Sequence, residues 1–192
     1  MGASLLPLIL LAAVEEPPPA AYPAEAVLDA FTQVCRGVED YAAAGRAARE
    51  KGWKDVAPDD DPNLRKLVDI GMKAVTDGRK VSLNFRRTVK GRTLYLVLSR
   101  FQDAKSWANG CRVYDFTAPT ALPQPLLEKW MKRPSTFRQA QEGVLTKLSW
   151  EPGWGKDITV EAAHVPRGSE LTGRTGLAGN VLVAQVTGQA AP

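Results

Sequence analysis

The chain has 192 residues, a hydrophobic share of 44%, a charged share of 24% and a formal net charge of +4. This length and composition favour one globular domain and exclude wholesale disorder or a fibrous repeat. The single histidine, His164, and the two cysteines, Cys35 and Cys111, are too few for the histidine clusters of most catalytic metal sites or for a four-ligand structural zinc site. We therefore expect no cofactor and no metal.

The N-terminus carries a short apolar run from Leu5 to Val14. The run is far shorter than the ~20 residues of a membrane-spanning helix, so we expect no transmembrane span. Its length suits a secretory signal peptide, with the small residue Ala13 at position −1 of the cleavage site. No basic residue precedes the run, and Leu11 departs from the usual small residue at −3. We predict a signal peptide over 1–13 and a periplasmic or secreted protein; the alternative is a frayed apolar N-terminus.

After the apolar run, a proline-rich spacer over 14–23 leads into a predicted single α+β domain over 24–192. An exported chain with only two cysteines favours a disulfide between Cys35 and Cys111, because oxidising compartments let such bonds persist. The bond would close a loop of about 75 residues and contribute roughly 4 kcal/mol in the chain-entropy model. The alternative is two buried free thiols in a cytosolic protein. Neither alternative makes the cysteines catalytic.

Helices are predicted in the first third of the domain. From 24 to 41, apolar residues recur at spacings of three and four and trace one helix face that includes Cys35. A second helix, or a continuation of the first, covers 42–51 and is ended by Gly52. A third helix starts with Asp61 as N-cap and runs to about residue 77. The acidic triplet over 59–61 lacks the spacing of a calcium loop, so we prefer the cap over a metal site.

The period then changes from 3.6 to 2, which predicts a β-hairpin. Treating Lys90-Gly91 as a two-residue turn places Phe85 opposite Leu96 on one apolar face. Further strands follow, with a short helix over 126–131, and together they predict an α+β fold: N-terminal helices packed on a mainly antiparallel sheet of about five or six strands, with one disulfide. The other strand candidates cover 111–117, 143–150, 158–165 and 181–187.

Catalytic motifs are absent from the sequence. The glycine-rich segment 173–179 lacks the Lys-Ser/Thr of a phosphate loop and is interpreted as a flexible loop. No nucleophile elbow is present, and His164 lies alone on a predicted strand. Asp115 is the one carboxylate that could act in a cleft, with Arg112 as a basic partner; the alternative is a hydrogen bond from Asp115 to a neighbouring loop backbone.

Charge is unevenly distributed along the chain. Residues 1–61 carry 5 basic and 11 acidic residues, whereas residues 62–192 carry 20 basic and 10 acidic residues. The first hairpin is rich in cations and free of acids, and its alternation places Lys80 and Arg86 on its outward face. Such a field attracts anions, so we expect an acidic protein or an anionic envelope surface as partner and no nucleic acid. The alternative is a solvated hairpin whose charges discourage edge-to-edge aggregation. The candidate anion-binding residues are Lys80, Arg86, Lys90 and Arg92.

Three segments carry a resemblance: Phe31-Thr-Gln-Val-Cys35, then 92–100, and then Asn109-Gly-Cys-Arg-Val-Tyr-Asp-Phe116. With these segments the chain resembles small exported proteins of alphaproteobacteria with two cysteines. The resemblance implies the same layout of signal and cysteines, and it brings no activity or site residue with it. We therefore expect an exported envelope or periplasmic binding or accessory protein without catalytic activity; the alternative is a small periplasmic hydrolase that uses Asp115.

Overall fold

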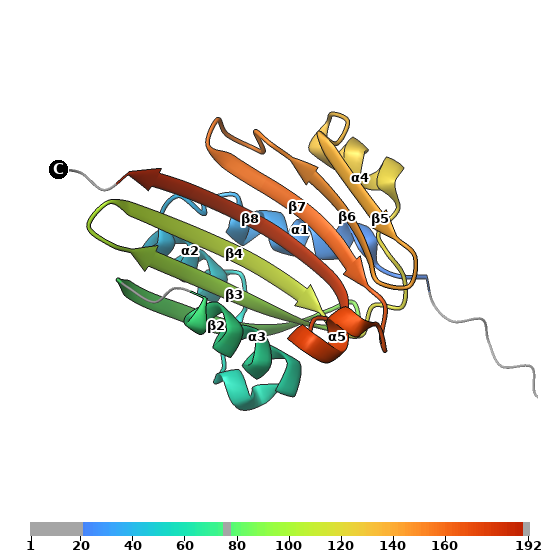
Figure 1. Cartoon of the computed structure of the whole chain (residues 1–192), viewed down its shortest axis with the longest axis horizontal. Coiled ribbons are helices and arrows are strands. Elements are labelled where there is room, and N and C mark those ends of the chain that lie inside the picture. The colour runs from blue at the N-terminus through green and yellow to red at the C-terminus, as the bar shows by residue number, and fades with distance from the viewer. Residues whose placement is uncertain (1–20, 75–77, 190–192) are drawn as a thin grey trace, which may run out of the picture.

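The computed structural model describes residues 21–74 and 78–189, and its strands form one antiparallel sheet (Figure 1). The sheet has eight strands in the order β1-β2-β3-β4-β8-β7-β6-β5. The α+β class is confirmed, but the expected count of five or six strands is wrong. The strands are β1 Lys54–Asp55, β2 Arg79–Val89, β3 Arg92–Gln102, β4 Ser106–Asp115, β5 Phe137–Gln141, β6 Leu145–Trp150, β7 Ile158–Val165 and β8 Gly179–Gln189.

The two strands missing from the sequence-based count form the two edges of the sheet. β1 has only two residues, too few to show a period. β5 has five residues, and all five are exposed. An edge strand that buries neither face needs no apolar alternation, so its sequence carries no strand signal.

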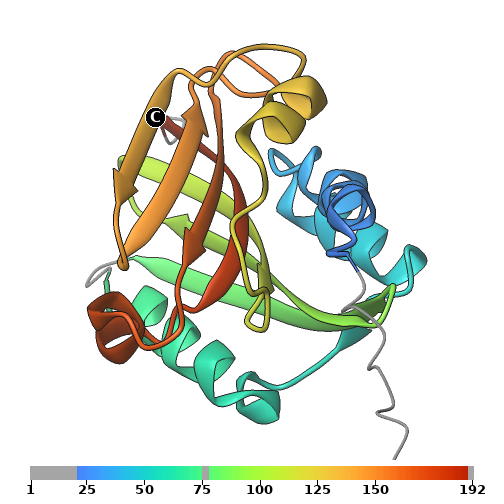
Figure 2. The ribbon, with the colours of Figure 1, turned by 90° about the vertical axis from the view of Figure 1, so that its right-hand side faces the viewer.

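Helices cover both faces of the sheet, and Figure 2 shows α1, α2 and α4 on one side and α3 and α5 on the other. We call these the α1 face and the α3 face. The helices are α1 Ala24–Cys35, α2 Tyr41–Glu50, α3 Pro62–Lys73, α4 Gln124–Met131 and α5 Glu170–Thr175, with a 3₁₀ helix over Pro58–Asp60. No helix among residues 21–74 and 78–189 is long and apolar enough to cross a membrane. The predicted signal peptide over 1–13 lies outside the described residues.

The first hairpin has the predicted register. Phe85 lies opposite Leu96, and the ladder of β2 and β3 closes at the pair Val89 and Arg92. Lys90 and Gly91 have φ values of 48° and 79°. Positive φ at both central residues is the geometry of a tight turn that matches the twist of the strands.

Local capping chemistry explains where two of the helices begin. Asp61 caps α3 as predicted, because its Oδ1 accepts hydrogen bonds from the backbone N–H groups of Asn63 and Leu64 at 2.8 and 3.2 Å. The expectation of a flexible loop over 173–179 is wrong in part, because α5 enters this segment. Its N-cap Ser169 accepts a hydrogen bond from the Thr172 N–H at 3.1 Å.

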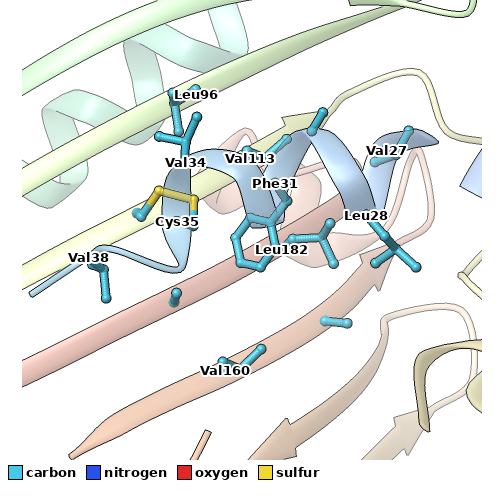
Figure 3. Close-up of a cluster of buried hydrophobic side chains, with 14 of the residues drawn as sticks. Val27, Leu28, Phe31, Val34, Cys35, Val38, Leu96, Val113, Val160 and Leu182 are labelled. Atoms are coloured by element: carbon cyan, nitrogen blue, oxygen red, sulfur yellow. A yellow bond between two sulfur atoms is a disulfide. The ribbon is translucent and has the colours of Figure 1, made fainter. Parts of the chain in front are cut away.

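The larger core lies on the α1 face, and the predicted disulfide lies within it (Figure 3). Cys35 of α1 and Cys111 of β4 are bonded across 76 positions, with a Cα–Cα distance of 5.4 Å and no exposed surface on either residue. The bond therefore joins the first helix to the middle of the sheet. Residues from α1 and from four strands pack around it, among them Phe31, Val34, Leu96, Val113, Val160 and Leu182.

A smaller core lies on the α3 face, where Leu64 of α3 packs among aromatic and aliphatic side chains. Tyr114 of β4 and Phe116 stack with ring centroids 5.4 Å apart. Farther along the same strands, this face carries polar residues such as Ser99 and Arg112. A groove opens where the surface of the sheet on this face changes from apolar to polar side chains. The buried members of this core are Leu64, Tyr95, Val97, Tyr114, Phe116, Val181 and Val183.

Candidate functional site

A groove of about 450 Å³ lies between α3 and the sheet. We call it the α3 groove. Its floor comes from β2, β3, β4 and β8, and one wall is the later part of α3. A volume of this size is typical of small-molecule sites, which measure about 300 to 1,000 Å³. Apolar side chains form much of it: Leu67, Val68, Ile70 and Met72 on the helix and Val97, Phe101 and Tyr114 on the floor.

The position of α3 explains why the groove exists. The N-terminal turn of the helix is held against the sheet, since Leu64 is fully buried in the smaller core. Farther along, Ile70 and Met72 keep 41% and 38% of their surface exposed although they are large and apolar. The C-terminal half of α3 therefore borders an open space with apolar side chains that the described chain leaves exposed.

Arg112 lies on the floor of the groove. It is partly buried, and its Nη1 donates a hydrogen bond to Ser99 Oγ at 3.1 Å. Gly110, two residues earlier on the same strand and face, makes room for it, because a Cβ at that position would collide with Arg112 Nη1. Within residues 21–74 and 78–189, Arg112 forms no ion pair with a carboxylate.

The charge of the groove is positive. Its lining contains Lys80, Arg100 and Arg112, and no acidic residue among those described. Lys80 Nζ donates a hydrogen bond of 2.6 Å to the backbone carbonyl of Met72, which connects β2 to the end of α3. Strand alternation directs the Arg100 side chain to the α1 face, where it donates to Gln102 Oε1 at 3.2 Å. Arg112 is thus the guanidinium whose side chain lies on the floor of the groove.

The four predicted anion-binding residues do not gather in one place. Lys80 lines the α3 groove, but Arg86 forms an ion pair with Asp60 at 3.0 Å, beside the 3₁₀ helix. Lys90 lies exposed in the hairpin turn. Arg92 forms an ion pair with Asp115 at 2.9 Å on the α1 face. The outward face of the hairpin is therefore partly covered by the segment that contains the 3₁₀ helix and α3, where Asp60 pairs with Arg86.

Asp115 has its hydrogen-bonding capacity taken up by neighbouring residues. Arg92 donates from Nε to Oδ2 and from Nη2 to Oδ1, both at 2.9 Å. The backbone N–H and the hydroxyl of Thr117 donate to Oδ1 at 2.9 and 2.8 Å, and the Tyr22 hydroxyl donates to Oδ2 at 3.1 Å. Burial alone would raise the pKa of Asp115, but the hydrogen bonds from Arg92 and Thr117 outweigh it and hold that pKa below its usual value.

This network has two consequences. A carboxylate with a lowered pKa and five donors is a weak general base, which disfavours the hydrolase alternative. Arg112 also does not join Asp115, because strand alternation places the two side chains on opposite faces of the sheet. The network instead fastens the segment before α1 to the sheet, with the Arg92 guanidinium 5.4 Å from the centre of the Tyr22 ring.

His164 is also held by a structural contact. It is buried, and its Nδ1 lies 3.0 Å from Asn180 Oδ1 on the neighbouring strand. The Asn180 side chain donates in turn to the Thr120 carbonyl at 3.1 Å. The pair therefore fixes the loop that precedes α4. Within the described ranges, no group of three or more His, Cys, Asp or Glu residues could hold a metal ion.

Comparison with protein-family models, with curated proteins and with solved structures gives no match. The likeness to alphaproteobacterial exported proteins therefore remains an expectation from the sequence. The groove itself was missed by sequence reasoning, which considered Arg112 only as a partner of Asp115. A usable signal was present, since Gly110, Arg112 and Tyr114 alternate onto one strand face and the glycine leaves room for the guanidinium.

Proposed function

We propose that this protein is an exported, non-catalytic binding protein that holds an anionic ligand in the α3 groove through Arg112. The observation that carries the proposal is the partly buried guanidinium on the floor of a groove whose described lining holds no acidic residue, without an ion pair among the described residues. Side chains that carry a charge are seldom withdrawn from water without a partner of opposite charge. An anionic ligand would supply that partner.

The groove also offers features that orient a ligand. Ser99 fixes the guanidinium by accepting one of its five N–H groups, and the remaining donors can meet a carboxylate, sulfonate or phosphate. The apolar wall lowers the local dielectric, which strengthens an ion pair relative to one in open water. These features recognise and retain a ligand.

Export is the second part of the proposal. It rests on the predicted signal peptide over 1–13 and on the buried disulfide between Cys35 and Cys111, because disulfides persist in oxidising compartments such as the periplasm. In that compartment the protein would meet ligands that come from the cell envelope or from outside the cell. Non-reducing peptide mapping of protein recovered from the periplasm tests the assignment, and two alkylatable thiols there would contradict it.

Arg112→Gln is expected to weaken binding of the fluorescent anion 8-anilinonaphthalene-1-sulfonate by about tenfold or more. The reason is that hydrogen bonds to a charged group contribute about 1.5–3 kcal/mol. Fluorescence titration of the full chain measures the dissociation constant. Because the contact is ionic and only partly buried, we also expect wild-type affinity to fall as salt rises from 0.05 to 0.5 M, as the Debye length shrinks.

Arg36→Gln serves as the matched control, because Arg36 is exposed at the end of α1, on the other side of the sheet, and the substitution removes the same charge. Its affinity should equal that of wild type. Arg112→Lys should recover part of the affinity through charge without the bidentate geometry. Equal affinities for wild type and Arg112→Gln would show that the probe binds elsewhere and would refute the proposed site.

A further inference from the structure

The exposed apolar side chains of α3 and the cation on the sheet lie in one cavity. Ile70 and Met72 line the same groove as Arg112, and both are among the three large hydrophobic residues that the described structure leaves exposed. Exposed apolar surface beside a cavity marks a binding site more often than isolated apolar residues do. A ligand that satisfies both features has an apolar part and an anionic part.

The ligand's charge follows from the cations that are available. Arg112 is a planar donor group on the floor, whereas the Lys80 ammonium keeps its charge and donates to the Met72 carbonyl at the end of α3. One guanidinium matches one carboxylate with two parallel hydrogen bonds. A phosphate monoester carries more charge and is bound best where several cations converge. The planar shape of the guanidinium therefore favours a carboxylate.

The ligand's shape follows from the groove. The floor strand β4 lines it from Ala108 to Tyr114, about 20 Å at the ~3.3 Å rise per residue of a strand. The volume of about 450 Å³ is near the lower end of the range for small-molecule sites. A space of this volume accommodates one extended alkyl chain and is too small for the two chains of a phospholipid.

We infer, building on the proposed function, that the ligand is a single-chain fatty-acid carboxylate. Its head group pairs with the Arg112 guanidinium above Gly110, and its alkyl chain lies between α3 and the sheet against Ile70, Met72 and Phe101. The chain would cover apolar surface of α3 that the described residues leave in water. The protein is thereby a carrier or scavenger of fatty acids.

Isothermal titration of the full chain with octanoate, decanoate and dodecanoate, each below its micelle concentration, tests this inference. Burial of methylene groups predicts about fourfold tighter binding per CH₂, which corresponds to ~0.8 kcal/mol each. Decanol should bind at least tenfold more weakly than decanoate. Affinity that is independent of chain length, or equal for the alcohol and the acid, would overturn the inference. Tighter binding of decyl phosphate than of decanoate would overturn the carboxylate assignment.

Two sets of variants locate the two ends of the ligand. Ile70→Ser with Met72→Ser should flatten the dependence on chain length, and both positions are exposed, so folding should be kept. Phe137→Ser is the control, because Phe137 is 54% exposed on the edge strand β5, outside the groove lining, and should leave the dependence unchanged. Gly110→Ala should weaken decanoate by displacing the end of the Arg112 side chain, with little change in the melting temperature.

The inference and the proposed function can fail separately. If the sulfonate probe depends on Arg112 but decanoate neither binds nor displaces it, the anion site stands and the fatty-acid assignment is wrong. If neither compound depends on Arg112, both are wrong. A decanoate affinity that depends on Ile70 and Met72 but not on Arg112 would also overturn the assignment, since the head group would then lie elsewhere.

Discussion

Replacing both Cys35 and Cys111 with alanine is expected to lower the free energy of unfolding by about 4 kcal/mol or more. The chain-entropy model assigns about this amount to a bond that closes a loop as long as the 76 positions between these cysteines. For a protein of this size, the loss corresponds to a fall in melting temperature of roughly 8–16 °C. Guanidinium denaturation followed by tryptophan fluorescence measures it.

The control for this change is the wild-type chain reduced after unfolding and refolded with its thiols free. Reduction removes the cross-link but keeps the sulfur atoms in the core, whereas alanine also removes their packing at two fully buried positions. The reduced protein should therefore fall between wild type and the double variant. If the double variant is as stable as wild type, the bond does not stabilise this fold and its role in our account is wrong.

Asp115→Asn is expected to destabilise the protein by about 3 kcal/mol at pH 7. Asp115 is 1% exposed and Arg92 25% exposed, so the change leaves a largely desolvated guanidinium without its counter-charge, and breaking such a pair costs about 3–5 kcal/mol. Asp60→Asn is the matched control. Its ion pair with Arg86 is more exposed and should contribute less than about 1 kcal/mol. Equal losses of unfolding free energy in the two variants would contradict the conclusion that the buried Asp115 pair stabilises the fold more than the exposed Asp60 pair.

The same pair sets a pH dependence with a definite sign. The folded-state pKa of Asp115 is below its unfolded value, which is about 3.9 for Asp. Its contribution to stability is therefore fully present above about pH 4 and is lost as pH falls through the folded pKa. The difference in unfolding free energy between wild type and Asp115→Asn should shrink as pH falls from 7 toward 3. A difference that grows toward acid pH would show that the folded-state pKa of Asp115 is raised, which would contradict the assigned direction.

Several features of the fold were predicted from local sequence patterns. The hairpin register follows from strand alternation and a two-residue turn, and Lys90-Gly91 supplies the positive φ values that this turn needs. The start of α3 follows from Asp61, whose side chain satisfies backbone donors within three residues. The disulfide was predictable because a chain with two cysteines allows only one internal pairing. Each of these signals depends on residues close in sequence or on simple counting.

Two elements, β5 and α5, were harder to predict. The edge strand β5 buries neither face, so its five residues show no alternation. The start of α5 depends on a cap at Ser169, inside a segment whose glycines predict a loop. β5 is stabilised by its hydrogen bonds to β6, whereas the cap at Ser169 is a short local signal that the neighbouring glycines obscure.

The sequence by itself determined the class of fold, the first hairpin, the α3 cap and the cysteine pairing, since local hydrogen bonds, strand period and composition specify them. Only the tertiary structure decided which basic side chains form ion pairs with acids of the chain and which do not. Arg92 meets Asp115 across 23 positions, and Arg86 meets Asp60 across 26. Arg112 lies on the α3 face without such a partner among the described residues. The physical reason is that an ion pair needs proximity within a few ångströms, and that proximity arises from the packing of segments distant in sequence.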